Sequence, residues 1–559
     1  MSLPLDINED SVIGKIQSGI GIKGNKLSKS DKELINLQVE RSLLLKTQQQ
    51  KYVEDLLQSN SNKSVKIANI QILGTNDQFR SSFINQQLKP ILQNNTGNTN
   101  LSHQNLQSFL QNLDKVNTNF ISSQAVKEFQ CYLETFPADP IDNSINNPFY
   151  NLSNPNTNIN IPNDTLNIVP VFKIIPSNRF FAKTGTTIGD GEGNGYINFQ
   201  FKNIFKGCEN LSFDATAGTR TKSSYLINFN TPILNKINFK SENLFFSNQR
   251  TIDWCSNHLQ SLKGFSNKFL YNHSDSLNFE FSIENSLRSI SVSNTAQHFL
   301  NSSNYLIKNS GDNFKSSIAF NVNYDKRNDF ILPTNGFYFK YQFEFANNLL
   351  RNLLSNKYQK NSKLFSHFIK NQFETQFAYK FNSNLFLNFN FKSGYLHNLN
   401  TNHDPFLMDN FNLGGPTDIR GFNFNGIGPL STKFNSNSPI INNSSSVDFL
   451  NVDRIGANFY YSSGISLFTT IPRFAPTLDS SFKFHTFLNF GKLISIKNIA
   501  KHSNQFFQLI RQPNVSTGFG IVFKHPSARL ELNFVLPLAA NQSDSIRKGL
   551  QYGIGLSFL

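Results

Sequence analysis

Apolar and polar residues alternate along most of the chain from about residue 180 to the C-terminus. In one run, Leu387, Phe389 and Phe391 are separated by Asn388 and Asn390. Because successive side chains of a β-strand point to opposite faces of a sheet, each set occupies its own face. The same period of two recurs in residues 197–202, 337–345, 529–536 and 552–558. The pattern predicts a large sheet with one apolar and one polar face.

The chemistry of the two faces favours a membrane-spanning barrel over a soluble β-sandwich. The apolar set is mostly Phe, Tyr and Leu, with 57 Phe in a chain whose charged fraction is only 16%. The polar set is rich in Asn, Gln, Lys and Glu, which suits a wet lumen. No run approaches the roughly 18 apolar residues of a membrane-spanning helix, and alternating strands account for the mean hydropathy of −0.36.

The length of the alternating region predicts the size of this barrel. The pattern continues to Leu559, as expected if the last strand closes the barrel and leaves no open edge in lipid. About 380 residues, at roughly 22–26 per strand and loop, give about sixteen strands. The expected fold is an all-β transmembrane barrel of about sixteen antiparallel strands, preceded by one small α+β domain.

The region before the barrel mixes strand and helix patterns. Residues 65–73 alternate as a strand, and helical spacing of apolar residues follows from Phe79 and again from Leu106. The predicted organisation is an N-terminal extension over residues 1–62, partly helical or disordered, an α+β domain over residues 63–178 with an Asn-rich insertion at about 138–164, and a barrel over residues 179–559.

Several other functions find no support in the sequence. The net charge of +15 is spread among the strands without a compact Lys/Arg block, so we expect no nucleic-acid partner. Cys131, Cys208 and Cys255 form no metal-binding or disulfide pattern, and no catalytic motif stands out. We therefore expect no enzyme activity, no cofactor and no metal. The first twelve residues predict neither a secretory signal peptide nor a mitochondrial presequence.

One Gly-rich stretch departs from the strand pattern. Leu413-Gly414-Gly415-Pro416-Thr417-Asp418-Ile419-Arg420-Gly421-Phe422 runs on to Gly426-Ile427-Gly428-Pro429. A barrel wall does not need such a loop, and its composition predicts backbone that packs against other parts of the protein. Arg420 is the residue that we single out, because the alternatives are a buried anchor for the loop or an arginine on an exposed hairpin tip.

These motifs resemble the β-barrel assembly superfamily, whose bacterial member is BamA, over roughly residues 63–559. The Gly-rich stretch is similar to the family's inward-folded sixth loop, at about residues 411–430, and Phe487-Leu488-Asn489-Phe490-Gly491 to the strand that receives its arginine. Bacterial relatives carry Asp at the position of Asn489. Residues 325–336 resemble the family's lead-in to a barrel strand, and residues 528–537 and 553–559 resemble the mitochondrial branch, the channel subunit of the sorting and assembly machinery.

The resemblance also implies which residues carry the function. Residues 63–178 are similar to one polypeptide-transport-associated domain. The first and last strands are implied to form a weakly paired lateral seam, near residues 196–205 and 551–559, and the last strand fits the mitochondrial sorting signal. The implied residues are Gly414, Gly415, Ile419, Arg420, Gly421, Phe422 and Gly428 in the loop; Phe487, Asn489 and Gly491 in the receiving strand; and Tyr196, Phe199, Phe201, Gln551, Gly553, Leu556 and Phe558 in the seam and sorting signal.

The function implied by the resemblance is assembly of outer-membrane β-barrels. The partners would be unfolded β-barrel precursors, accessory subunits of a membrane complex and the lipid bilayer. The expected location is the mitochondrial outer membrane, with the N-terminal domain in the intermembrane space. The alternatives are a protein translocation channel of the same superfamily, a porin-type diffusion pore and a soluble β-rich binding protein.

Overall fold

The structure, a computed structural model, divides into two compact units, Met1–Asn178 and Arg179–Leu559. It describes residues 41–559 except for 43, 50, 53–54, 56–57, 68, 75–77, 93–103, 136–164, 190–191, 253–254, 293–301, 348–364, 400–404, 434–451, 472–479, 497–510, 527 and 556–557. Most of the N-terminal extension and the Asn-rich insertion therefore lie outside the described residues. Among the described helices, none is long and apolar enough to span a membrane.

The first unit is a small α+β domain built on one sheet. Its elements are β1 (Ser64–Ile67), β2 (Gln71–Leu73), α3 (Ser81–Leu92), β3 (Gln104–Asn105), α4 (Leu106–Ser122), β4 (Val126–Thr135) and β5 (Thr165–Pro176). β5 pairs in parallel with β1 and β2 and antiparallel with β4. The apolar faces of both helices supply the core, where Phe83, Phe109 and Phe120 are fully buried together with Phe172 of β5. Burial raises the pKa of Cys131, in β4, to about 11.

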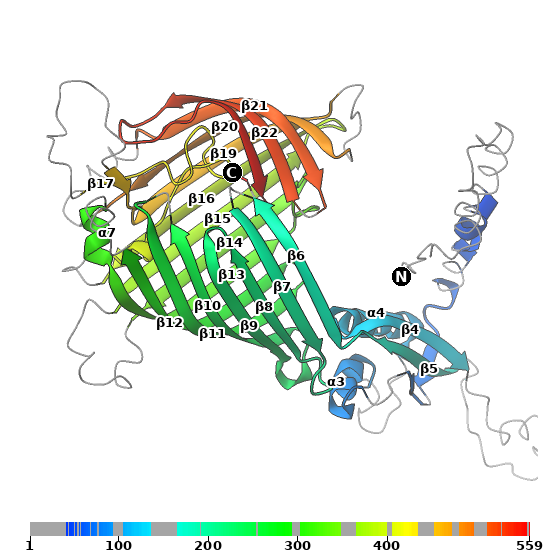
Figure 1. Cartoon of the computed structure of the whole chain (residues 1–559). Helices are drawn as coiled ribbons and strands as arrows, with labels where there is room; N and C mark the ends of the chain where they lie inside the picture. The colour runs from blue at the N-terminus through cyan, green and yellow to red at the C-terminus, as the bar shows by residue number, and fades with distance from the viewer. Residues whose placement is uncertain are drawn as a thin grey trace, which may run out of the picture. The chain divides into compact units, whose positions relative to one another are not determined.

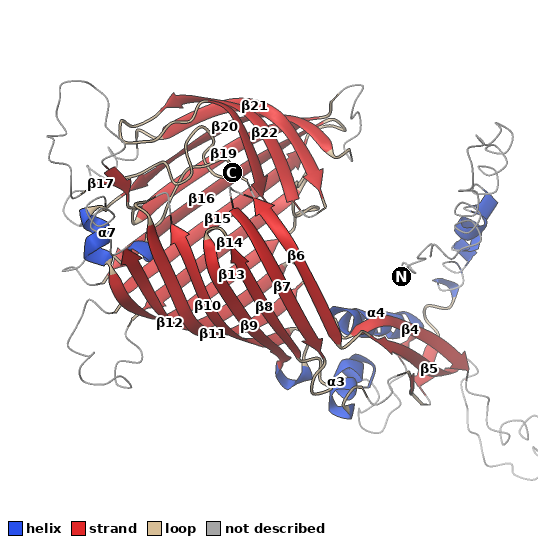
Figure 2. Ribbon diagram, viewed as in Figure 1, coloured by secondary structure: helices blue, strands red, loops and turns tan. Residues whose placement is uncertain are grey.

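The second unit is a single sheet of sixteen strands (Figures 1 and 2). Its strands are β6 (Phe180–Gly189), β7 (Glu192–Lys202), β8 (Asn210–Gly218), β9 (Thr221–Pro232), β10 (Phe239–Ile252), β11 (His258–Ser274), β12 (Leu277–Val292), β13 (Gly311–Asp325), β14 (Gly336–Ala346), β15 (Phe368–Lys380), β16 (Leu385–Asn398), β19 (Phe459–Thr469), β20 (Phe482–Ile494), β21 (Asn514–His525), β22 (Ala528–Ala539) and β23 (Gly549–Gly555). Each strand pairs antiparallel with the next in this order. The prediction of about sixteen antiparallel strands is confirmed.

The sheet exposes many of its apolar side chains and buries many polar ones, the reverse of a sheet in a soluble protein. In β20, Phe484 and Leu488 are exposed, whereas His485 and Asn489, each the residue that follows one of them, are completely buried. β22 repeats the arrangement, with Leu532 exposed on one side and polar side chains buried on the other. A water-soluble sheet would bury the apolar set instead. The arrangement is that of a barrel whose outer face meets hydrocarbon and whose interior holds polar groups.

Three short elements lie in the connection between β16 and β19. The turn η5 (Leu407–Asp409) comes first, and β17 (Leu430–Thr432) pairs with β18 (Val452–Arg454) further along the chain. A short helix, α7 (Asn304–Asn309), lies in the connection between β12 and β13. It contributes Leu306 to a small apolar cluster with Ile290 of β12 and Leu407 of η5. This cluster places the start of the β16–β19 connection against the barrel wall.

Candidate functional site

Residues 411–430, called the lumen loop from here on, fold back on themselves and pack against the inner wall. The amide of Ile427 donates to the carbonyl of Leu413 at 3.1 Å, which closes the loop as a hairpin. Ile419 and Phe422 are fully buried in an apolar cluster with Leu493 of β20. The loop therefore fills lumen space beside the C-terminal strands, and it does not extend into solvent.

Arg420, at the tip of the loop, has no solvent exposure. Its Nη1 donates to Asn489 Oδ1 at 3.0 Å and to the Leu559 carbonyl at 2.9 Å, and its Nε donates to Glu531 Oε2 at 3.0 Å. The guanidinium carbon lies 4.6 Å from the ring centre of Phe487. The structure thus brings Arg420 together with Phe487 and Asn489 of β20, two residues named by the resemblance.

The charge that balances Arg420 comes from Glu531, a residue that the motif comparison did not select. Glu531 is fully buried as a side chain and also pairs with Arg529 on its own strand, β22. One carboxylate therefore holds two buried guanidinium groups. Its only sequence signal is its place on the polar face of the segment 529–536, which does not reveal a partner 111 residues away.

Two glycines allow the loop to approach the wall closely. Gly421 has a φ of +88°, and a Cβ there would lie 3.1 Å from Val535 Cγ1. A Cβ on Gly491 of β20 would lie 2.7 Å from Ile419 Cδ1 and 2.5 Å from the Tyr461 carbonyl. Larger side chains would push Ile419 and Arg420 away from their partners. The remaining glycines of the predicted loop motif also have positive φ: Gly414, Gly415 and Gly428.

The loop also holds the beginning of the last strand. The Gly421 amide donates to Gln551 Oε1 at 3.0 Å, and the Arg547 amide donates to the Gly421 carbonyl at 2.8 Å. Phe422 and Ile546 form an antiparallel bridge, and the Gly428 amide donates to Asp544 Oδ1 at 2.9 Å. The connection from β22 to β23 is therefore paired with the lumen loop through its backbone.

Phe558 and Leu559 turn into the lumen, whereas the sequence predicted that they continue the last strand. β23 ends at Gly555, and Phe558 and Leu559 are buried. The Leu559 amide donates to the Thr417 carbonyl at 3.1 Å, and Asn390 Nδ2 donates to the Phe558 carbonyl at 2.8 Å. These contacts replace the ladder bonds that a longer strand would make. Gly553 lies in β23, and Leu556 is outside the described residues.

The predicted position of the first barrel strand was wrong. Tyr196, Phe199 and Phe201 lie on β7, and the first strand is β6, which pairs with β7 from Phe180↔Phe201 to Gly189↔Glu192. The Gly-rich stretch 189–195 includes the connection between β6 and β7. It contains Asp-Gly between the two paired strands, a dipeptide that favours two-residue hairpin connections. The residues that were expected on the first strand therefore lie on the second strand of the sheet.

A second segment folds inward at the opposite end of the barrel, between β13 and β14. Leu332 is buried against Phe386, Phe468 and Val522, from β16, β19 and β21. Asp329 pairs with Lys524 of β21. Burial opposes ionisation of Asp329, but hydrogen bonds from Lys524 and from backbone amides outweigh it and lower the pKa. This turn lies within the predicted lead-in motif, residues 325–336, and braces the wall that carries the Arg420 cluster.

A sixteen-strand barrel with an apolar outer face, a polar interior and a loop anchored in its lumen is typical of outer-membrane channels that contain an internal loop. The match to a family model is consistent with this class: the Omp85 superfamily domain matches residues 203–558. The chain belongs to the Omp85 superfamily.

Individual relatives share much of the chain. It is similar to the sorting assembly machinery 50 kDa subunit of Saccharomyces cerevisiae, with 29% identity over 70% of this chain and 77% of the relative. A SAM50-like protein of Schizosaccharomyces pombe is 30% identical over 68% of this chain and 72% of its own length. A structure of BamA from Haemophilus ducreyi lacking POTRA domains 1–3 has the same fold, with a TM-score of 0.61, 12% identity and coverage of 88% of this chain and 84% of that one.

Proposed function

We propose that this chain folds β-barrel precursor proteins and inserts them into the mitochondrial outer membrane through a lateral opening between β6 and β23. It is an outer-membrane β-barrel assembly channel, and the names of its fungal relatives support this function. The process is non-enzymatic and needs no cofactor. The N-terminal unit would face the intermembrane space, and accessory subunits would complete the complex.

The observation that carries the lateral opening is the pairing at the two ends of the sheet. Among the described residues, β6 pairs only with β7 and β23 only with β22. Both end strands therefore keep one edge of backbone N–H and C=O groups without a strand partner from this chain. In hydrocarbon each unsatisfied backbone group costs several kcal/mol. A client strand that pairs with such an edge removes this cost for the channel strand and for the client strand.

Pairing through the backbone explains how clients of different sequence could be accepted. Backbone hydrogen bonds supply affinity in β-augmentation, whereas side-chain pockets supply specificity. β23 has glycine at 549, 553 and 555, so its own side chains fix the register only weakly. Each added client strand would present a new edge until the client closes into a barrel and leaves.

Site-specific photo-crosslinking tests this proposal. A photoreactive residue placed at Thr184 of β6 or Tyr552 of β23, both exposed, is expected to capture a radiolabelled barrel precursor arrested during insertion. The matched position is Ser212, which lies on the polar face of β8 between Gln200 and Asn228. Adducts at Ser212 without adducts at Thr184 and Tyr552 would refute lateral templating and favour translocation through the lumen.

A further inference from the structure

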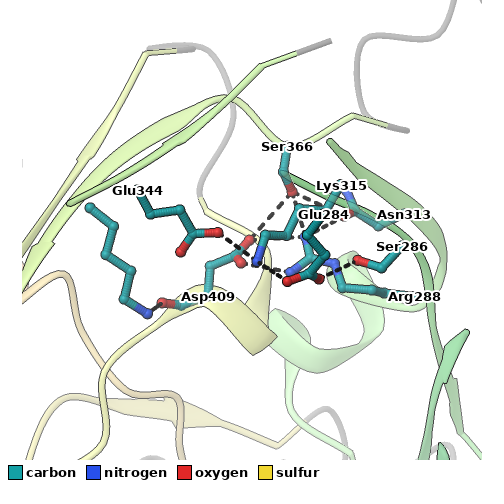
Figure 3. A network of polar contacts seen from close by, with 9 residues as sticks. Glu284, Ser286, Arg288, Asn313, Lys315, Glu344, Ser366 and Asp409 are labelled. Carbon is teal, nitrogen blue, oxygen red and sulfur yellow. Dashed lines mark hydrogen bonds and ion pairs between the residues drawn. The ribbon is translucent and has the colours of Figure 1, made fainter. Parts of the chain in front are cut away.

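A second cluster of buried charges lies just before the lumen loop, at η5 (Figure 3). Arg288 of β12 and Asp409 of η5 are 3% and 4% exposed, and Arg288 Nη1 lies 2.6 Å from Asp409 Oδ1. Arg288 Nη2 donates to Asn313 Oδ1 at 2.5 Å and to Ser366 Oγ at 2.6 Å. The pair is therefore held by hydrogen bonds from several elements as well as by charge.

Further cations surround Asp409. Lys370 of β15 donates to its backbone carbonyl at 3.1 Å. Lys315 of β13 lies in the same network, where it pairs with Glu344 at 2.6 Å and with Glu284 at 3.7 Å (Figure 3). Asp409 is thus the anion contributed by the connection between β16 and β19 to a wall that presents Arg288, Lys315 and Lys370.

The strand that carries Arg288 lies far around the barrel from β22, the strand that carries Glu531. β12 and β22 are eight positions apart in the sixteen-strand order. With strands about 4.8 Å apart and a tilt of roughly 40°, a ring of this size is about 32 Å across. Fully extended, the eleven residue steps from Asp409 to Arg420 would span about 36 Å, and the side chains of the two ion pairs add to this reach. The chain between the two ion pairs is long enough to cross the lumen.

The two ion pairs have opposite polarity. At one end the loop segment supplies the anion, Asp409, to the cation Arg288. At the other end it supplies the cation, Arg420, to the anion Glu531. Docking in the reverse direction would place Asp409 beside Glu531 and Arg420 beside Arg288, with like charges buried together. Arrangements of this kind select one orientation by making the alternative unfavourable.

We infer that Arg288 and Asp409 are positioning residues that orient the lumen loop across the barrel, so that Arg420 reaches Glu531. The pair anchors the start of the loop to β12, and the Arg420 cluster anchors its tip to β20 and β22. The loop therefore links the wall opposite the C-terminal strands to the strands beside β23. The inference concerns loop placement and does not depend on the client or on the lateral opening.

Disulfide trapping of the loop tip tests the inference in the full-length protein in vesicles. In a background with Cys131, Cys208 and Cys255 replaced by alanine, Thr417→Cys and Gly555→Cys form the reporter pair. A Cβ at Gly555 would lie 3.3 Å from Thr417 Cγ2. Asp409→Asn, which leaves Arg288 near Lys315 and Lys370 without this anion, is expected to lower the trapping yield at least fivefold. Arg288→Met combined with Asp409→Asn removes the anchor without leaving its arginine unpaired, and it is expected to trap at least fivefold less than the parent.

The controls separate positioning from general destabilisation. Glu280→Gln removes an ion pair from the same wall, between Lys268 and Glu280 at 3.5 Å, and is expected to leave trapping unchanged. Asp409→Glu keeps the charge and is expected to trap like the parent, even if Asp409→Asn does not fold. Parental trapping in folded Asp409→Asn, recovery of trapping in the double variant, or loss of trapping in Asp409→Glu would each overturn the inference. No client is present, so failure of the lateral-opening proposal would leave this result unaffected.

Discussion

Glu531→Gln is expected to destabilise the barrel by about 3–5 kcal/mol, which is typical when one partner of a buried ion pair is removed. The variant leaves Arg420 and Arg529 buried close together without their shared carboxylate. Arg420→Gln should cost less, because Arg529 still balances Glu531 in that variant. The measurement is the midpoint of urea unfolding of the protein in vesicles. Unfolding is detected by the heat-dependent migration of the protein on gels.

The control for this prediction carries the same substitution on another strand. Glu280→Gln breaks the ion pair between Glu280 and Lys268, whose side chains are 29% and 33% exposed, respectively. Partly exposed ion pairs contribute about 0–1 kcal/mol, so its urea midpoint should hardly move. Equal shifts for Glu531→Gln and Glu280→Gln would show that the buried cluster does not anchor the loop.

Phe519→Lys is expected to destabilise the protein in a bilayer by about 2–4 kcal/mol, the cost of a Lys on the lipid face near the midplane. Phe519 lies in the middle of β21, is 51% exposed and contacts Phe534 of β22 at a ring distance of 5.7 Å. Its exposure is to hydrocarbon, which cannot solvate an ammonium group. Urea titration in vesicles measures the loss.

Ser212→Lys provides the matched lumen position, because its cross-strand neighbours are Gln200 and Asn228. A new Lys there should remain hydrated and leave the urea midpoint nearly unchanged. A soluble sheet would give a different result, since Phe519 would face water and a Lys at this position would be tolerated. Equal midpoints for Phe519→Lys and the parent protein would therefore argue against a lipid-facing outer surface.

The sequence was informative wherever structure depends on short-range pattern. Alternation predicted the strands, because strand period and lipid contact impose alternation on every strand of such a barrel. The length of the alternating region predicted their number. The pattern placed the first strand near residues 196–205, whereas β6 begins at Phe180, because alternation does not show which strand of a series comes first. It also predicted that the last strand continues to Leu559, whereas contacts with Thr417 and Asn390 turn these residues inward.

The partners of the buried charges could not be predicted in the same way. Arg420 was selected from the loop motif, but Glu531 and Arg288 looked like other polar residues on the inner face of a strand. Arg288 and Asp409 are 121 residues apart, and only closure of the barrel brings β12 to the start of the loop. Asn489 was expected to be a partner of Arg420, and Arg420 donates a hydrogen bond to its neutral amide, while the balancing negative charge comes from Glu531.

Reconstituted insertion tests the proposed function most directly. The full-length protein is placed in vesicles, and a urea-unfolded β-barrel precursor is added while protease-protected, folded precursor is measured over time. We expect folded precursor to accumulate at least several-fold faster in vesicles that contain this protein than in protein-free vesicles or in vesicles that contain an unrelated sixteen-strand porin. Accumulation at the same rate in all three preparations would contradict the assignment of this chain as an assembly channel.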